Sequence, residues 1–100
     1  MGTLVLDFPA LGSTKTVQAD AEAYDVSGSV SAPAAAEVTV YDGPNLDNLV
    51  EHVFVGPYSP HTWWGGSGIP LVKKVASGSK LRIVSTGAVS FRIDGPFSLV

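Results

Sequence analysis

The sequence contains no cysteine, which excludes disulfide frameworks, zinc–thiolate sites and thiol nucleophiles. Charged residues are also scarce, at 15% of the chain against a usual share of about 25%. A protein surface with few charged side chains is poorly soluble in water and is often covered by another molecule. The composition therefore favours a protein that acts with an assembly partner over a solitary enzyme.

Basic residues are few, and Lys73–Lys74 is the densest cluster in a chain of net charge −3. Nucleic-acid binding by counterion release needs many lysines and arginines, so we expect no nucleic-acid partner. No apolar run approaches the roughly 20 residues that span a bilayer. The first residues, MGTLVLDFPALG, lack the basic region of a secretory signal. We therefore expect a soluble protein with no membrane partner and no signal peptide.

Helical patterns are almost absent, because the one helix-tolerant stretch, Ala19–Ala23, is too short to stand as a helix. Instead, short segments of period-2 alternation recur every 8–12 residues or so, separated by glycine, proline, serine and aspartate. This pattern predicts one all-β domain over residues 1–100, an antiparallel sandwich or barrel of about eight short strands. The expected strands are 2–8, 14–19, 24–31, 37–42, 49–55, 69–76, 80–85 and 88–94.

Two of these strands carry more specific expectations. In Leu49–Val55 the alternation places Val53 and Val55 on one face, with His52 and Phe54 on the other. In the segment Tyr24–Ser31, Gly28 interrupts a run of otherwise alternating side chains. A glycine inside a strand indicates a bulge or a close neighbouring backbone.

The sequence contains few candidates for a metal-binding or catalytic site. His52 and His61 could bind a metal with Asp42 or Asp47, but the spacing matches no H-x-x-x-H or H-E-x-x-H motif. Asp42, Asn45 and Asp47 could contribute to a calcium loop, yet their irregular spacing around a proline favours a hairpin turn. There is no G-x-S-x-G elbow and no evident carboxylate pair for glycoside hydrolysis. We therefore expect no enzymatic activity, no metal and no cofactor.

The most distinctive stretch is Tyr58–Pro70, YSPHTWWGGSGIP, which reads as a long loop with the adjacent pair Trp63 and Trp64. Three interpretations remain open for this pair: packing in the core, stacking on a sugar, and contact with a protein partner. Consecutive side chains of an extended segment point to opposite faces. One ring can therefore serve the core while the other meets a neighbour.

Both ends of the chain, residues 1–13 and 95–100, are apolar. They carry Phe8, Phe97 and Leu99, among other large side chains. Burying such a side chain contributes about 1.5–3 kcal/mol, so we do not expect these segments to stay in water. The ends are expected to be docking or intersubunit elements, or edge strands of the same sheet.

The run VTVYDGPNLDNLVEHVFV, the later GGSGIPLVKK and the hairpin LRIVSTGAVSFRI together resemble small β-sandwich proteins of tailed-phage virions. The best-fitting members of that group are capsid decoration, or cement, proteins. The resemblance covers Glu37–Asp94 and implies a jelly-roll-like sandwich, commonly trimeric, that sits on the outer capsid surface. It implies binding to the major capsid protein, with no cofactor and no catalysis.

Two functions follow as hypotheses. The first is a structural virion protein that stabilises contacts between capsid subunits, with an interface drawn from Trp63, Trp64, Phe8, Phe97 and Leu99. The alternative is a carbohydrate-binding β-sandwich of a phage fibre or adhesin. The sugar-binding alternative requires an exposed aromatic ring with carboxamide or carboxylate groups beside it.

Overall fold

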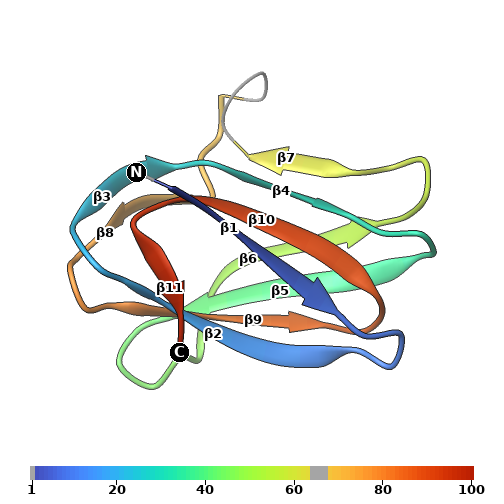
Figure 1. Ribbon diagram of the computed structural model, residues 1–100, viewed down its shortest axis with the longest axis horizontal. Coiled ribbons are helices and arrows are strands. Elements are labelled where there is room, and N and C mark those ends of the chain that lie inside the picture. The colour runs from blue at the N-terminus through green and yellow to red at the C-terminus, as the bar shows by residue number, and fades with distance from the viewer. Residues whose placement is uncertain (1, 64–67) are drawn as a thin grey trace.

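The computed structural model of the chain describes residues 2–63 and 68–100, which form antiparallel β-strands and no helix (Figure 1). The all-β prediction is therefore confirmed. The strands are β1 (Gly2–Phe8), β2 (Ser13–Ala19), β3 (Ala23–Val26), β4 (Gly28–Ser31), β5 (Ala36–Asp42), β6 (Asn48–Val55), β7 (His61–Trp63), β8 (Val72–Val75), β9 (Lys80–Ser85), β10 (Val89–Gly95) and β11 (Phe97–Leu99).

The pairing of the strands follows one simple rule. The first five strands pair in reverse order with the next five, so that β1 pairs with β10, β2 with β9, β3 with β8, β4 with β7 and β5 with β6. The chain is thus a nested set of hairpins, like one long two-stranded ribbon that has been folded over. This arrangement is a jelly roll, which confirms the expected fold class.

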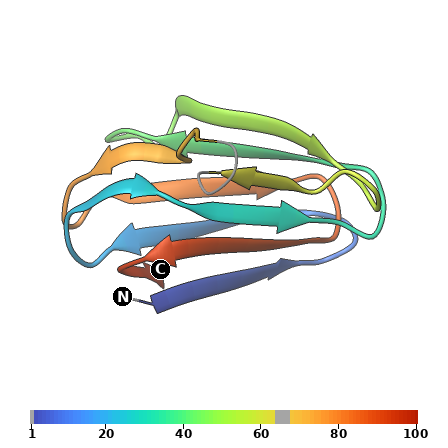
Figure 2. The same cartoon turned by 90° about the horizontal axis from the view of Figure 1, so that it is seen from above.

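Two further pairings close the ribbon into two sheets. β10 also pairs with β4, which gives the sheet order β1-β10-β4-β7. β9 also pairs with β5, and β11 adds to β2, which gives the order β11-β2-β9-β5-β6. β3 and β8 form a separate two-stranded ribbon at one end of the sandwich (Figures 1 and 2).

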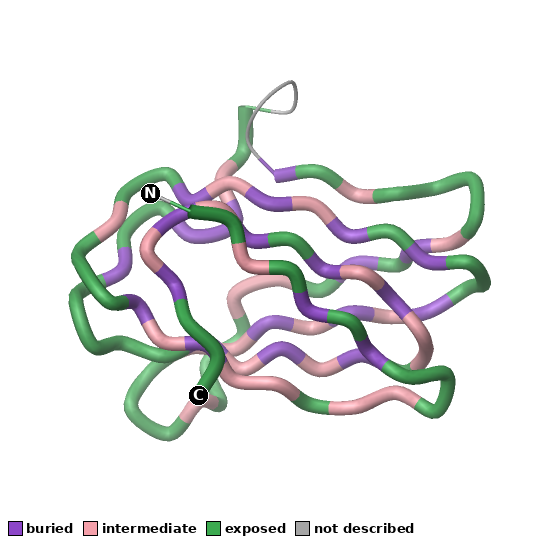
Figure 3. The backbone as a smooth tube through the Cα atoms, in the orientation of Figure 1, coloured by how far each residue is buried: buried purple, intermediate pink, exposed green. Residues whose placement is uncertain are grey.

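The core lies between the two sheets and is made by every second side chain, so buried and exposed residues alternate along the strands (Figure 3). The expected phase of β6 is confirmed, since Val53 and Val55 are buried while His52 and Phe54 are exposed. The largest side chains with almost no exposure are Trp63, Phe91, Leu81, Ile83, Ile93, Val17, Val30, Val38 and Val40.

Three differences from the expected strands have structural causes. The segment 24–31 is not one strand, because the chain passes at Ser27 from β3, which pairs with β8, to β4, which pairs with β10, and Asp25 within β3 has a left-handed φ of 48°. β7 lies within the expected loop, and β11 lies in the expected tail. Both are only three residues long, too short to show alternation in the sequence.

Gly28 confirms the expectation of a close neighbour. A Cβ atom added at this position would lie 2.5 Å from the backbone oxygen of Arg92 on the adjacent strand β10. The absence of a side chain therefore lets β4 and β10 approach each other. Gly28 also pairs with Trp63 of β7 on its other side.

The two ends of the chain are edge strands of the sandwich. β1 is the edge of one sheet and β11 is the edge of the other, and the two strands contact each other. This agrees with the edge-strand alternative for the apolar termini, except that the two ends lie in different sheets and not in the same one. It also explains their composition, since Leu6, Phe8 and Phe97 are buried in the core.

Candidate functional site

The five residues expected at an interface lie in different environments. Trp63 has 1% of its surface exposed, and Phe8 and Phe97 are also buried, so these three contribute to the core of a single chain. Leu99 is 54% exposed on the edge strand β11. Trp64 lies outside the described residues. Of the four described residues, only Leu99 offers a side chain to a partner in this conformation.

Two aromatic rings pack against Trp63. Its ring centroid lies 4.7 Å from that of His61, in an edge-on arrangement, and 5.4 Å from that of Phe91. Its indole nitrogen is buried and has no hydrogen-bond partner among residues 2–63 and 68–100. Among the interpretations of the tryptophan pair, packing in the core is the one that describes Trp63.

The candidate metal ligands are engaged in short-range contacts. His52 Nε2 lies 2.9 Å from Glu37 Oε1 on the neighbouring strand, and its ring packs against Phe54. Asp42 accepts a hydrogen bond of 2.6 Å from Asn48 Nδ2 across the β5–β6 hairpin. Over residues 2–63 and 68–100, no three histidines, aspartates or glutamates are grouped so that they could hold a metal ion.

Loops without charged residues form a surface at one end of the sandwich. Four connections meet there, between β1 and β2, β4 and β5, β6 and β7, and β9 and β10 (Figures 1 and 2). Their sequences are PALG (9–12), APAA (32–35), GPYSP (56–60) and TGA (86–88), and none of them contains a charged residue. We call this surface the uncharged end.

Contacts join the four loops of the uncharged end in two pairs. A Cβ atom on Gly12 would overlap the backbone of Ser85 and Thr86, so the first loop lies directly against the last. Gly87 likewise approaches the backbone oxygen of Ala10, at 3.8 Å for an added Cβ. A Cβ atom added at Gly56 would lie 3.9 Å from Ala35 Cα, so the two remaining loops also lie side by side.

The first loop is a tight turn that presents a leucine. The backbone N–H of Gly12 donates a 2.8 Å hydrogen bond to the carbonyl of Pro9, and Gly12 has a left-handed φ of 81°. The turn holds Leu11 at its tip, where 97% of its surface is exposed. Proline fixes φ at the start of the turn, so little backbone freedom remains to be lost on binding.

The third loop presents a tyrosine in the same manner. Gly56 and Ser59 exchange two backbone hydrogen bonds, of 3.1 and 3.4 Å, which enclose Pro57 and Tyr58 in a two-residue turn. Tyr58 is 95% exposed. Tyrosine and leucine side chains held apart from the core in ordered turns are apolar surface that the fold itself does not use.

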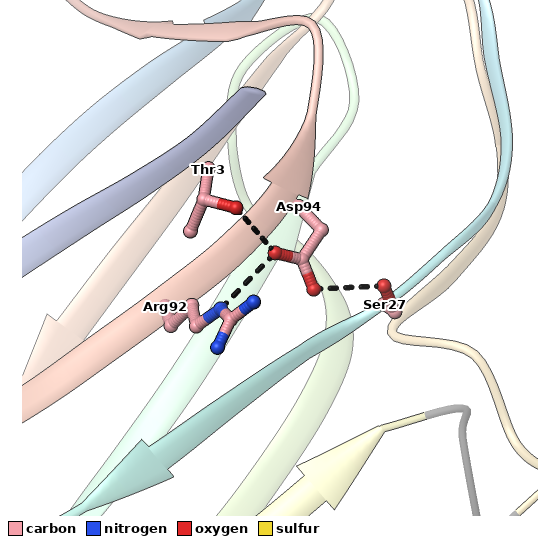
Figure 4. A network of polar contacts seen from close by, with 4 residues as sticks. All are labelled: Thr3, Ser27, Arg92 and Asp94. Atoms are coloured by element: carbon pink, nitrogen blue, oxygen red, sulfur yellow. Dashed lines mark hydrogen bonds and ion pairs between the residues drawn. The ribbon is translucent and has the colours of Figure 1, made fainter. Parts of the chain in front are cut away.

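The opposite end of the sandwich is charged and polar. There Asp94 of β10 accepts hydrogen bonds from Thr3 Oγ1 at 2.9 Å, Ser27 Oγ at 2.9 Å and Arg92 Nε at 3.1 Å (Figure 4). Partial burial by itself would raise the pKa of this carboxyl group. The three hydrogen bonds and the positive charge of Arg92 outweigh the burial, so the pKa of Asp94 lies below its ordinary value. The carboxylate thus ties β1 and the β3–β4 junction to β10.

This network predicts a stability change in acid. Because the folded-state pKa is lowered, the stabilisation is complete above the ordinary aspartate pKa of about 4 and is lost as the pH falls through the folded value. The free energy of unfolding of Asp94→Asn should therefore depend less on pH below about pH 4 than that of the wild type. Urea titrations at several pH values measure this, with a variant of the exposed Asp47, Asp47→Asn, as control. Parallel profiles for the wild type and Asp94→Asn would contradict the assignment.

Sequence analysis placed Leu11 in an apolar terminus that was expected to dock and Tyr58 at the start of the long aromatic loop, but neither residue was named for an interface, and the other two loops were treated only as breaks between strands. The lack of charge in all four loops is visible in the sequence, yet nothing in one dimension shows that these four turns, and no others, share one end. The nested pairing of the strands determines which turns lie at the same end. Leu11 and Tyr58 were therefore missed as candidate interface residues.

In residues 2–63 and 68–100 there is no helix that is long and apolar enough to cross a membrane. Comparison of the chain with protein-family models, with curated proteins and with solved structures finds no match.

Proposed function

We propose that this chain is a structural virion protein of the decoration type, which docks on the outer capsid surface and stabilises contacts between major capsid protein subunits. The observation that carries the proposal is the uncharged end, with Leu11 and Tyr58 held in ordered turns. The resemblance of Glu37–Asp94 to decoration proteins supports the same function, and the jelly roll is compatible with it.

The physical argument concerns the cost of docking. Charged groups lose hydration when they enter an interface, and the four loops contain none. Tyrosine is enriched among the residues that dominate binding energy, and burial of a leucine contributes about 1.5–3 kcal/mol. Turns closed by hydrogen bonds and prolines also lose little entropy on binding. A junction between capsid subunits with an apolar surface is therefore the partner that this end fits best.

We further propose that the chain associates with itself as a homotrimer through its terminal edges. Val5 of β1 and Leu99 of β11 are more than half exposed and lie on contacting edge strands. The native mass at micromolar concentration, measured by light scattering, is expected to be that of three chains. A monomer over the whole concentration range would contradict this part of the proposal and leave docking by the uncharged end as a separate question.

The carbohydrate-binding alternative, with the sugar on the tryptophan pair, has less support. Trp63 shows almost no ring surface, and Trp64 lies outside the described residues. A non-enzymatic role also fits the two histidines, since His52 is paired with Glu37 and His61 packs against Trp63.

The docking proposal is tested with the double variant Leu11→Ser/Tyr58→Ser. Both side chains are almost fully exposed, so the melting temperature should stay close to that of the wild type. Binding to capsid shells stripped of the chain, measured by co-sedimentation, should weaken at least about tenfold, because hot-spot residues contribute more than about 1 kcal/mol each.

Phe54→Ser is the matched control, because Phe54 is an exposed aromatic residue on β6 outside the four loops. It should bind shells like the wild type. Wild-type binding by the double variant, or equal losses in the double variant and the control, would argue against docking through the uncharged end.

A further inference from the structure

We propose that a groove at the charged end of the sandwich binds a neutral carbohydrate, with Tyr24 as its stacking platform. The groove has a volume of about 650 Å³ and runs between residues 21–27 and the turn Asp94–Pro96. Ligand sites typically enclose about 300–1,000 Å³, so this groove is large enough for a small oligosaccharide. We call it the Tyr24 groove.

Tyr24 provides an exposed and ordered aromatic ring. The residue is 60% exposed on β3, and its hydroxyl group donates a hydrogen bond to Glu22. The ammonium group of Lys74, its partner across the β3–β8 ribbon, lies 5.6 Å from the ring centroid. These two contacts fix the ring before any ligand arrives, which lowers the entropic cost of stacking.

Carboxylates lie along the same groove as hydrogen-bond acceptors. Glu22 and Asp25 are exposed on the side of β3, and Asp94 is held in place by its three hydrogen bonds at the opposite wall. Pro96 and Ala23 add small apolar surfaces between these groups. An aromatic face flanked by fixed acceptors matches the chemistry of a sugar ring, which has an apolar C–H face and hydroxyl groups at its rim.

A cation is the competing ligand, because carboxylates and an aromatic face also attract ammonium groups. Lys74 argues against it. Its ammonium group already interacts with the ring of Tyr24, and a second positive charge at that ring would be repelled. A neutral sugar meets no such repulsion, so the observations favour carbohydrate.

The Tyr24 groove lies away from the uncharged end. β10 leaves the uncharged end after the loop 86–88 and reaches the groove at Asp94, so the sheet separates the two surfaces. Docking through the uncharged end would leave the Tyr24 groove accessible to a ligand. Carbohydrate binding can be measured on the isolated chain, so its failure would not affect the docking proposal.

The test uses three neutral probes, cellotriose, maltotriose and chitotriose, with binding followed by NMR titration. At least one is expected to bind with a Kd of about 1 mM or tighter. Tyr24→Ala should weaken that binding at least tenfold, whereas Tyr24→Phe should retain most of it because the ring remains. Tyr58→Ala is the matched control, since it removes an equally polar and more exposed ring at the uncharged end.

Thermal unfolding of each variant verifies that the fold is retained, and spermidine provides the cationic probe. Signals of residues 21–27 should shift on sugar addition while those of 56–60 remain unchanged. The proposal would be overturned by the absence of binding for all three trisaccharides, by wild-type affinity in Tyr24→Ala, or by tighter binding of spermidine than of any sugar.

Discussion

Replacement of Trp63 by alanine is expected to lower the free energy of unfolding by about 3–5 kcal/mol. The indole is the largest fully buried side chain and packs against His61 and Phe91, so its removal leaves a cavity at the edge where β7 joins the sheet. A domain of this size is stable by about 5–15 kcal/mol, so the loss is a large fraction of the total. Chemical denaturation with urea measures it, and the melting temperature should fall by more than about 10 °C.

Tyr58→Ala provides the control for Trp63→Ala, because both changes delete a large aromatic side chain from neighbouring positions in the sequence. Tyr58 is 95% exposed, so its removal should change the free energy of unfolding by less than about 0.5 kcal/mol. If Trp63→Ala cost less than about 1 kcal/mol, the assignment of Trp63 to the core would be wrong.

The second large effect is expected for Gly12→Ala, at about 3 kcal/mol or more. Two costs combine at this position. The backbone φ of 81° is left-handed, which an alanine adopts at a cost of about 1–2 kcal/mol. The new Cβ would also overlap the carbonyl of Ser85 and lie 2.8 Å from the carbonyl carbon of Thr86, so the contact between the first and last loops must open.

Gly78→Ala separates these two costs. Gly78 has a similar φ of 86°, yet an added Cβ would have no atom within 4 Å. Its free energy of unfolding should therefore fall by only the conformational cost, about 1–2 kcal/mol. Equal losses at Gly12 and Gly78, measured in the same urea series, would mean that the loops of the uncharged end do not touch as described.

Much of the fold could be predicted because the alternation of side chains and the turn residues are visible in short stretches of sequence. In β5 and β6, alternating side chains and a D-G turn are enough to place the strands and the buried face. The break between β3 and β4 at Ser27 could not be predicted, because it follows from pairing with different partners, β8 for β3 and β10 for β4. β7 was hidden because it has only three residues, too few for alternation to show in the sequence, and it is defined by its pairing with β4.

The candidate surface was harder to predict than the fold. Trp63, Phe8 and Phe97 were predicted at an interface because their side chains are large and apolar. The core requires the same properties, and all three side chains are buried in it. Leu11 and Tyr58 stand in short turns inside segments that the sequence marked as apolar or aromatic, but within those segments the larger side chains were chosen instead. Exposure of a side chain depends on which strands flank its turn, and that is a property of the nested pairing.

Amide hydrogen exchange on the shell-bound protein tests docking through the uncharged end most directly. The account predicts that binding to capsid shells slows exchange in the four loops 9–12, 32–35, 56–60 and 86–88, which meet at one end of the sandwich. Exchange at residues 20–27 and 76–79, at the opposite end, should stay as it is in the free protein. Protection confined to that opposite end, with the four loops unchanged, would contradict the proposal.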